Sequence, residues 1–175
     1  RNASIEAVNK AKTHFGGLDV VINNAGYGVF GAIEEVAEQD VKGVFDTNVF
    51  GTLWVTQAAL PIFREQGHGH IIQLSSVLGV WTLPTLGIYN ATKFAVRGFT
   101  ESLRQELNIQ NNGVSVTCVH PGGIRTNIAN SARMNDSIRS LGMNPAKASR
   151  AFNKVLKTPP EVAAKIILDA VRKNK

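Results

Sequence analysis

The chain has 175 residues, which is enough for one domain with a sizeable core. It is 43% hydrophobic and 18% charged, a balance typical of a soluble globular protein and outside the range of disordered chains. No apolar run is long enough to span a membrane, and the single cysteine, Cys118, excludes an internal disulfide and a cysteine-rich metal site. We therefore expect a cytoplasmic protein in which Cys118 is a structural thiol within an apolar strand.

The net charge of +6 is unevenly distributed along the chain. Residues 1–122 carry 8 basic and 10 acidic side chains, whereas residues 123–175 carry 11 and 3. The basic part has no dense lysine run, interleaved aromatic residues or nucleic-acid reader motif, so a solvated basic face is the preferred interpretation. We predict no nucleic-acid partner and no membrane partner, although an anionic cofactor would also experience this field.

Helical and strand patterns alternate along the chain. A helical repeat of apolar residues over 5–15 ends at Gly16-Gly17. Two long helical stretches follow at about 38–66 and 88–110. Three nearly continuous apolar runs have strand character: Leu18–Asn23, His70–Leu74 and Val114–Val119. The alternation predicts a single α/β domain over residues 1–175, with parallel strands joined by right-handed crossovers.

A last helix is expected at about 158–173. Its start, Thr158-Pro159-Pro160-Glu161, matches a capping box with proline in the first turn. Its predicted apolar face consists of Val162, Ile166, Ile167 and Val171.

Small and polar residues follow each predicted strand. Asn23-Asn24-Ala25-Gly26 ends the first, Ser75-Ser76 the second and Pro121-Gly122-Gly123 the third. Each cluster alone is consistent with ordinary turn chemistry. The carboxyl ends of parallel strands meet along one edge, however, where open α/β sheets bind their ligands. Together the three clusters predict a ligand site.

Tyr89 and Lys93 are one helical turn apart, and Ser76 lies thirteen residues before the tyrosine. A phenol titrates at about pH 10, and an ammonium group four residues along a helix can favour the phenolate. The three residues would supply a proton donor, a cation that lowers its pKa and a hydroxyl that holds the reacting oxygen. Tyr-x-x-x-Lys by itself is more often a surface helix pair, so the prediction depends on the neighbouring motifs.

Asn48 is placed among apolar residues on one helical stripe. The stripe consists of Val44, Phe45, Asn48, Thr52 and Val55. A buried amide must find hydrogen-bond partners. Asn48 is therefore either a core asparagine satisfied by main chain or a residue of the site.

These motifs occur in the order and spacing of a known family. The chain resembles the short-chain dehydrogenase/reductases, in their typical NAD(P)-dependent branch, from about Leu18 to the final helix. The matching motifs are Asn-Asn-Ala-Gly at 23–26, Asp-Thr-Asn-Val-Phe-Gly around Asn48, Ser76, Tyr89-x-x-x-Lys93 and Pro121-Gly122-x-x-x-Thr126. The resemblance implies a three-layer Rossmann-like fold of which this chain holds strands 4–6. The glycine-rich turn after the family's first strand and the family's last strand have no match, so we expect a fragment that is inactive alone and exposes the edge of its first strand.

The resemblance also implies an activity and roles for individual residues. The reaction would be hydride transfer between NAD(P) and a secondary alcohol or ketone, with NAD versus NADP left open. Tyr89 would be the general acid and base, Ser76 would bind the substrate oxygen, Lys93 would lower the pKa of Tyr89 and hold the nicotinamide ribose, and Asn48 would anchor a proton-relay water. The expected cofactor contacts are Asn24, Ala25, Gly26, Tyr89, Lys93, Pro121, Gly122, Ile124 and Thr126. The alternative is a non-catalytic Rossmann-like regulator that senses nucleotides.

Two further predictions concern substrate choice and assembly. The segment 125–157 is expected to select the substrate, or else to pack on the core as a connection. Its candidate apolar lid consists of Ile128, Met134, Ile138, Met143 and Phe152. A homodimer or homotetramer could form through the two long helices. The residues considered for this contact, which could equally be core, are Phe50, Leu53, Trp54, Phe99 and Leu103.

The four histidines lack metal-ligand spacing, so no metal is predicted. His68 and His70 flank Gly69, and we expect both in a solvated turn.

Overall fold

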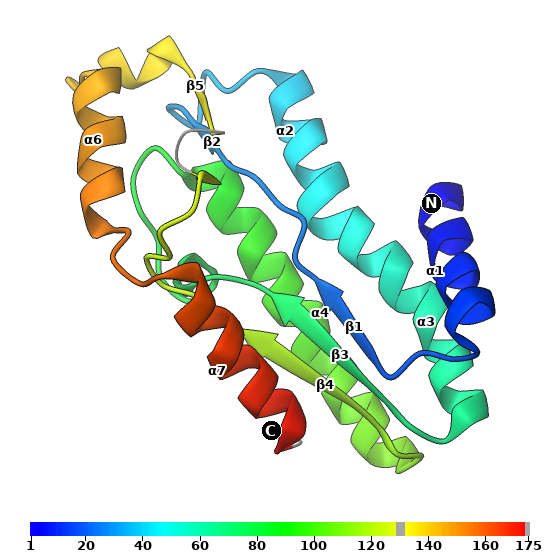
Figure 1. The fold of residues 1–175 in the computed structure, drawn as a ribbon. Helices are drawn as coiled ribbons and strands as arrows, with labels where there is room; N and C mark the ends of the chain where they lie inside the picture. The colour runs from blue at the N-terminus through cyan, green and yellow to red at the C-terminus, as the bar shows by residue number, and fades with distance from the viewer. Residues whose placement is uncertain (129–131, 174–175) are drawn as a thin grey trace.

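The computed structural model describes residues 1–128 and 132–173. Its centre is a three-stranded parallel sheet in the order β1–β3–β4, made of β1 (Val20–Asn23), β3 (Gly69–Leu74) and β4 (Val114–Val119) (Figure 1). The three strands fall on the three predicted apolar runs. The predicted α/β fold with a Rossmann-like parallel sheet is confirmed.

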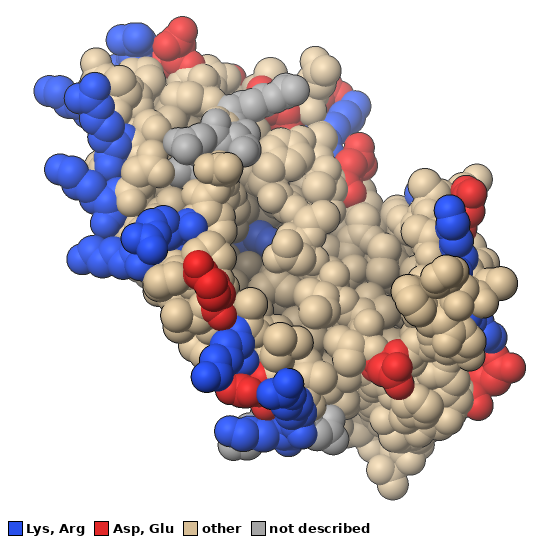
Figure 2. Space-filling view, viewed as in Figure 1, with Lys and Arg blue, Asp and Glu red and all other residues tan. Residues whose placement is uncertain are grey.

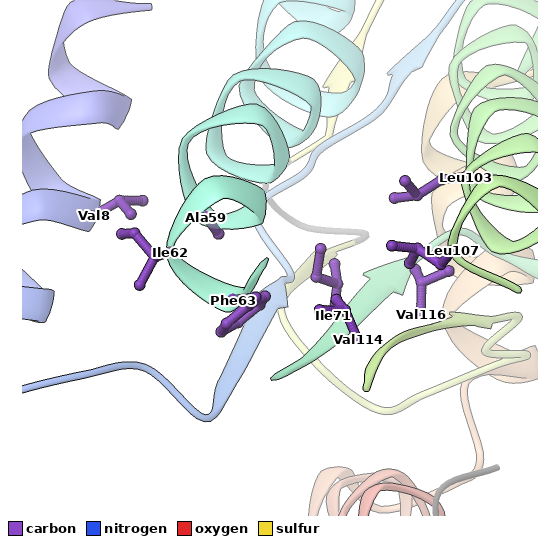
Figure 3. Packing of buried hydrophobic residues seen from close by; sticks show 9 residues of the cluster. All are labelled: Val8, Ala59, Ile62, Phe63, Ile71, Leu103, Leu107, Val114 and Val116. Atoms are coloured by element: carbon purple, nitrogen blue, oxygen red, sulfur yellow. The ribbon is translucent and has the colours of Figure 1, made fainter. Parts of the chain in front are cut away.

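Helices lie on both faces of this sheet. α1 (Asn2–Phe15), α3 (Thr52–Gln66) and α4 (Gly87–Gln110) lie on one side, whereas α7 (Pro160–Arg172) lies over the other (Figure 1). Aliphatic and aromatic side chains fill the space between the sheet and the helices α1, α3 and α4 (Figure 3). The buried residues of this core are Val8, Ala59, Ile62, Phe63, Ile71, Leu103, Leu107, Val114 and Val116.

The long helix predicted over 38–66 is divided by a π-helical turn. α2 (Glu38–Phe45) runs into the wider turn η1 (Asp46–Gly51), which continues into α3. A π-turn inserted between α-helices is rare and is frequently found at functional sites. Here it contains Asn48.

A second, two-stranded sheet forms beyond the carboxyl ends of the main strands. β2 (Val29–Phe30) pairs in parallel with β5 (Arg133–Met134), although about a hundred residues separate them in the sequence. Two short turns, η2 (Val77–Gly79) and η3 (Asp136–Arg139), and the helix α6 (Pro145–Val155) complete this end of the molecule (Figure 1).

The capping box predicted at Thr158 does not form. α7 begins at Pro160 with Pro159 as its N-cap and without a side-chain capping hydrogen bond. Thr158 instead pairs through its main chain with Ile124, and its carbonyl oxygen accepts a hydrogen bond of 2.8 Å from the N–H of Arg125. Thr158 is thus one residue before the N-cap, in an extended pairing instead of the capping position.

Apolar side chains remain exposed on β1 and α7. Val20 and Ile22 of β1 are 38% and 47% exposed, and β1 has a strand partner on only one side among the described residues. The predicted apolar face of α7 is also not buried, since Val162 and Ile166 are among its exposed residues. Because β1 is the outer strand of the described sheet, the expectation of an exposed first-strand edge is confirmed. Within residues 1–128 and 132–173, no helix has both the length and the apolar character needed to cross a membrane.

Candidate active site

The ends of β3 and β4 continue side by side beyond the strands. The N–H of Ser75 donates to the carbonyl of Val119 at 2.9 Å, and the N–H of Val77 donates to the carbonyl of Pro121 at 3.0 Å. The loops after these two strands are thus held together at the carboxyl edge of the sheet. The N-terminal part of α4, which carries Tyr89 and Lys93, contacts this edge at η2.

Lys93 is almost completely buried at this edge. It is 5% exposed, and its Nζ donates a hydrogen bond of 2.7 Å to the carbonyl oxygen of Leu74, the last residue of β3. Burial lowers the pKa of Lys93 to about 8, because desolvation disfavours the ammonium form. The amine is consequently mostly protonated at neutral pH but titrates far closer to neutrality than an exposed lysine does.

Tyr89 lies against Lys93 and Ser76. The Lys93 Nζ is 5.6 Å from the centre of the Tyr89 ring. Burial raises the pKa of the Tyr89 phenol, while a hydrogen bond with the Ser76 side chain acts in the opposite direction. These side chains alone therefore do not give the lowered phenol pKa expected from the sequence, since desolvation outweighs the favourable contacts.

The Ser76 hydroxyl is oriented by its own turn. Its Oγ accepts a hydrogen bond of 3.1 Å from the N–H of Leu78, so Ser76 caps η2. An oxygen that accepts this bond still has its own proton to donate. The hydroxyl is therefore available as a donor to the Tyr89 oxygen or to a substrate oxygen.

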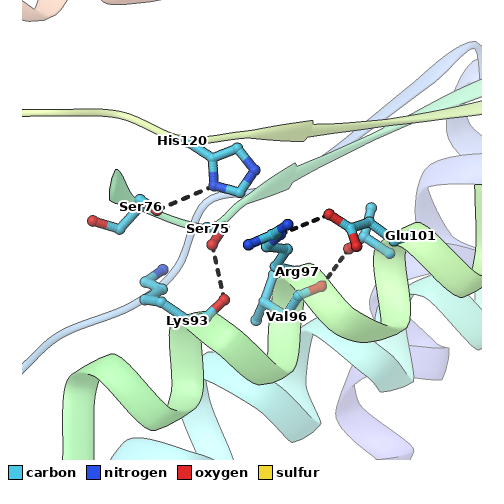
Figure 4. A network of polar contacts seen from close by, with 8 residues as sticks. Ser75, Ser76, Lys93, Val96, Arg97, Glu101 and His120 are labelled. Atoms are coloured by element: carbon cyan, nitrogen blue, oxygen red, sulfur yellow. Dashed lines mark hydrogen bonds and ion pairs between the residues drawn. The ribbon is translucent and has the colours of Figure 1, made fainter. Parts of the chain in front are cut away.

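Ser75 fixes the same turn to α4 (Figure 4). Its hydroxyl donates to the carbonyl oxygen of Lys93 at 2.8 Å. Gly79 allows this close approach, because a Cβ at Gly79 would lie 2.3 Å from the Ser75 Oγ and 2.8 Å from the Lys93 carbonyl oxygen. η2 and the lysine are thus packed with no room for a side chain between them.

Asn48 is 1% exposed and uses its whole side chain in hydrogen bonds. Its Oδ1 accepts from the N–H of Tyr27 at 3.0 Å, and its Nδ2 donates to the Tyr27 carbonyl at 2.9 Å and to the Thr92 Oγ1 at 3.0 Å. Asn48 therefore ties the loop after β1 to α4, one residue before Lys93. Satisfaction by main chain, one of the two alternatives considered for Asn48, is confirmed; its role as the anchor of a water stays a prediction.

The loop after β1 lies directly beside these groups at Gly26. A Cβ at Gly26 would be 3.1 Å from the Asn48 Oδ1 and 3.4 Å from the Lys93 Nζ. The other predicted cofactor contacts form the rim of the same edge. Asn24, Ala25, Gly122 and Thr126 are exposed, whereas Pro121 and Ile124 are half-buried. Their roles as cofactor contacts stay predictions.

One layer lower, a buried amide network connects the strands to α3. Asn23 donates to the Gln73 Oε1 at 2.8 Å and to the Thr56 Oγ1 at 3.2 Å, and Gln73 donates to the same hydroxyl at 2.8 Å. Because all three residues are buried, the hydrogen bonds satisfy groups that water cannot reach. The network therefore fixes Asn23, the last residue of β1, from which the chain continues into the site.

An apolar wall stands next to Tyr89, and the sequence did not reveal most of it. Its buried members are Phe30, Leu78 and Leu86, with Leu83, Tyr89, Ala132, Met134 and Phe152 packed against them. Phe30 meets Phe152 edge to face, with ring centres 5.4 Å apart. The pairing of β2 with β5, and hydrogen bonds from Asn135 N–H to Phe30 O (2.8 Å) and from Gly31 N–H to Thr85 O (2.9 Å), hold the wall together.

The apolar lid predicted within 125–157 is only partly realised. Met134 and Phe152 belong to the wall, but Ile138 is completely buried in its own turn and Met143 is 38% exposed. Phe30 could have been found only from its pairing with Met134, a contact between segments distant in the sequence.

The histidines differ from one another in environment. His68 lies in an exposed turn as predicted, with its Nε2 3.4 Å from an Asp19 carboxylate oxygen. His70 is instead a buried residue of β3, with its ring nitrogens 2.9 Å from Thr117 Oγ1 and 3.1 Å from Ser115 Oγ, so the prediction of a solvated position is wrong. Within the described part of the chain, no group of three or more His, Cys, Asp or Glu side chains is placed to hold a metal ion.

Basic side chains gather on one side of the molecule, over α6 and the chain that leads into α7 (Figure 2).

Cys118 is half-buried in β4, and burial raises the pKa of its thiol. Such a thiol is a poor nucleophile, which is consistent with the structural role predicted for it.

Comparisons with known proteins agree with this geometry. The family model described as short chain dehydrogenase matches residues 1–137. The chain is 38% identical to the oxidoreductase SadH of Mycobacterium tuberculosis, over 99% of this chain and 62% of that protein. It is 35% identical to a 3-ketodihydrosphingosine reductase of Bacteroides thetaiotaomicron, over 89% of this chain and 65% of that protein.

Solved structures give the same picture. A short chain dehydrogenase/reductase from Burkholderia phymatum in complex with NAD superposes with a TM-score of 0.84 at 27% identity, over 97% of this chain and 63% of that chain. A short-chain dehydrogenase from Streptomyces avermitilis gives 0.81 at 30% identity. The present chain thus spans about 62% of the length of the curated relative SadH.

Proposed function

Because this chain belongs to the short-chain dehydrogenase/reductase family, we propose that it is part of an oxidoreductase that interconverts a secondary alcohol and a ketone with NAD(P), and that Tyr89 handles the proton. The observation that carries the proposal is the meeting of three groups at the carboxyl edge of the sheet. The Ser76 side chain is close enough to Tyr89 to act against the rise in the phenol pKa, and the buried amine of Lys93 lies 5.6 Å from the centre of the Tyr89 ring.

The cofactor would supply or accept the hydride, and the residues present at this edge fit such a group. Gly26 leaves free space beside Lys93 and Asn48 that a side chain would restrict. Lys93 would hold the nicotinamide ribose, and the rim of Asn24, Ala25, Gly26, Pro121, Gly122, Ile124 and Thr126 would contact the remainder. NAD and NADP are both compatible with these residues.

In the direction of reduction, Ser76, Tyr89 and Lys93 would each have a different role. Ser76 would donate its proton in a hydrogen bond to the carbonyl oxygen, and Tyr89 would transfer its proton to the same oxygen as negative charge develops there. A raised pKa keeps Tyr89 protonated at neutral pH, which is the state that reduction requires. Lys93, with a pKa of about 8, can exchange protons with solvent near neutrality and so restore the phenol.

The apolar wall indicates the kind of substrate. Its buried members, Phe30, Leu78 and Leu86, carry no charged or hydrogen-bonding side chain. A substrate group beyond the reacting carbonyl would therefore be apolar, since burying a polar group there would leave it without partners. The relative named as a 3-ketodihydrosphingosine reductase is consistent with a ketone of this character.

Self-association is a further part of the proposal. Phe50 is 41% exposed and stacks on Trp54, with ring centres 6.1 Å apart, at the outer surface where η1 meets α3. We expect the homodimer or homotetramer predicted through the two long helices to cover this pair. Leu103 does not contribute to it, because it is buried in the core.

The test uses the full-length protein with NADH and NADPH and two probe ketones, acetophenone and methyl nonyl ketone. Replacing Tyr89 by Phe should lower turnover by about 10²–10⁴-fold, because the proton donor is lost while the ring remains. Tyr27→Phe is the matched control. Unchanged turnover in Tyr89→Phe would remove Tyr89 from the chemistry, whereas nucleotide binding without turnover in the unaltered protein would favour the nucleotide-sensing alternative.

A further inference from the structure

The main chain of Ser76 is fixed from β4 by a side chain as well as by main-chain bonds (Figure 4). Its carbonyl oxygen accepts a hydrogen bond from His120 Nδ1 at 3.1 Å and another from the N–H of Gly79 at 2.8 Å. Main-chain bonds hold the residues on either side of it, from Ser75 N–H to Val119 O and from Val77 N–H to Pro121 O. Ser76 is thus held between two main-chain bonds, with His120 beside it.

A proline interrupts the main-chain pairing beside His120. Where two parallel segments run together, each normally provides both donors and acceptors to the other. Pro121 accepts from Val77 but has no N–H to return. In a parallel ladder that N–H would face the carbonyl of Ser75, and the imidazole of the preceding residue, His120, contributes a donor one residue further along, at Ser76.

We infer that His120 is a positioning residue of the active site: its Nδ1–H fixes the Ser76 peptide and thereby keeps the Ser76 hydroxyl against the Tyr89 oxygen. A carbonyl oxygen can only accept, so Nδ1 must carry a proton in every state in which the bond exists. The inference rests on the proposed roles of Ser76 and Tyr89, and it adds a residue outside Tyr89, Ser76, Lys93 and Asn48.

The consequence concerns the chemical step more than substrate binding. Without the His120 bond, the N–H of Gly79 is the remaining partner described above for the Ser76 carbonyl, so the hydroxyl is held less tightly in its alignment with the phenol. His120 is not part of the apolar wall, so the contacts proposed for the substrate's apolar group stay intact. Since the Ser76 hydrogen bond opposes the effect of burial on Tyr89, its loosening should also raise the pKa of that phenol further.

The experiment compares two amide substitutions in the full-length protein. An asparagine amide nitrogen occupies nearly the position of histidine Nδ1, whereas a glutamine amide reaches toward Nε2 instead. His120→Gln should therefore lower kcat by about tenfold with KM changed by less than about twofold, and His120→Asn should recover most of that loss. His68→Gln, at the exposed turn, is the matched control and should leave both parameters unchanged.

Two readouts do not depend on turnover. Long-range proton–nitrogen NMR of the imidazole should show His120 protonated at Nδ1, and ultraviolet titration against Tyr89→Phe should show a higher phenol pKa in His120→Gln than in the unaltered protein. Equal effects of Asn and Gln, a change confined to KM, or an Nε2–H tautomer would each overturn the inference. If Tyr89→Phe also left turnover intact, the proposed function itself would fail; if Tyr89→Phe were inactive and His120→Gln normal, only this inference would.

Discussion

Removing the buried amine of Lys93 should stabilise the protein at neutral pH and abolish one component of its pH dependence. Lys93 is 5% exposed, and its pKa falls from the ordinary value of 10.5 to about 8 on folding. At about 1.4 kcal/mol per pH unit, keeping Lys93 protonated in the folded state costs about 3 kcal/mol below pH 8. Between pH 8 and 10.5 the unfolded chain holds more protons than the folded protein, so stability rises with pH in that window.

The assay is urea unfolding of the full-length protein without cofactor, in the unaltered form and as Lys93→Met. The variant cannot be protonated, so the advantage of Lys93→Met over the unaltered protein should shrink by about 2 kcal/mol between about pH 7 and pH 9.5. Leu74 loses its hydrogen-bond donor in the variant, which subtracts about 1 kcal/mol at every pH and leaves the slope unaffected. Lys42→Met, at an exposed position paired with Glu38, is the control and should show no slope. A pH-independent difference between Lys93→Met and the unaltered protein would refute the account of a desolvated amine.

Three other substitutions test the structure around the site. Asn48→Ala removes hydrogen bonds to the Tyr27 main chain and to Thr92 and should lower the free energy of unfolding by about 2–3 kcal/mol, measured by urea titration; a loss below about 0.5 kcal/mol would contradict the contacts. Gly79→Ala should lower the free energy of unfolding by about 1–3 kcal/mol, because the new Cβ has no space. Gly98→Ala, in α4 with nothing within 4 Å of its Cβ position, should raise it by up to about 1 kcal/mol. Equal effects of the two substitutions would be inconsistent with the packing. Phe152→Ala opens the apolar wall beside Phe30 and should raise kcat/KM for methyl nonyl ketone relative to acetone by about tenfold, and an unchanged ratio would remove Phe152 from the substrate site.

The sequence was sufficient where local pattern determines structure. Continuous β-branched and aliphatic runs predicted all three strands of the main sheet. The predicted end of the helical stretch at about residue 110 coincides with the end of α4, where Asn111 adopts a left-handed conformation with a φ of 44°. The small and polar residues after the strands correctly indicated one edge, because parallel strands must end together.

Features that depend on distant contacts could not be read from the sequence. The π-turn at Asn48 forms where the amide meets the main chain of Tyr27, 21 residues away, and a helical periodicity carries no sign of it. Phe30 and Met134 are brought together by two residues of pairing in each strand, too short to predict. His70 was predicted both as the first residue of a strand and, beside Gly69, as part of a solvated turn; strand pairing with β4 buries it against Thr117.

The pKa of Tyr89 shows a different kind of limit. Its spacing from Lys93 correctly predicted proximity, since the two side chains lie together at the sheet edge. Spacing does not report how deeply each group is buried, and burial acts on the phenol and on the amine in opposite directions, raising one pKa and lowering the other. The two values therefore move apart: the phenol stays protonated at neutral pH, and the lysine becomes the more acidic of the two groups.

A crystal structure of the full-length protein with NAD⁺ bound would test the central claim most directly. The account predicts the nicotinamide ribose within hydrogen-bond distance of Lys93 Nζ, with the hydroxyls of Tyr89 and Ser76 converging on one position beside the nicotinamide ring. A dinucleotide bound away from the carboxyl edge of the sheet, or a ring out of reach of Tyr89, would contradict it.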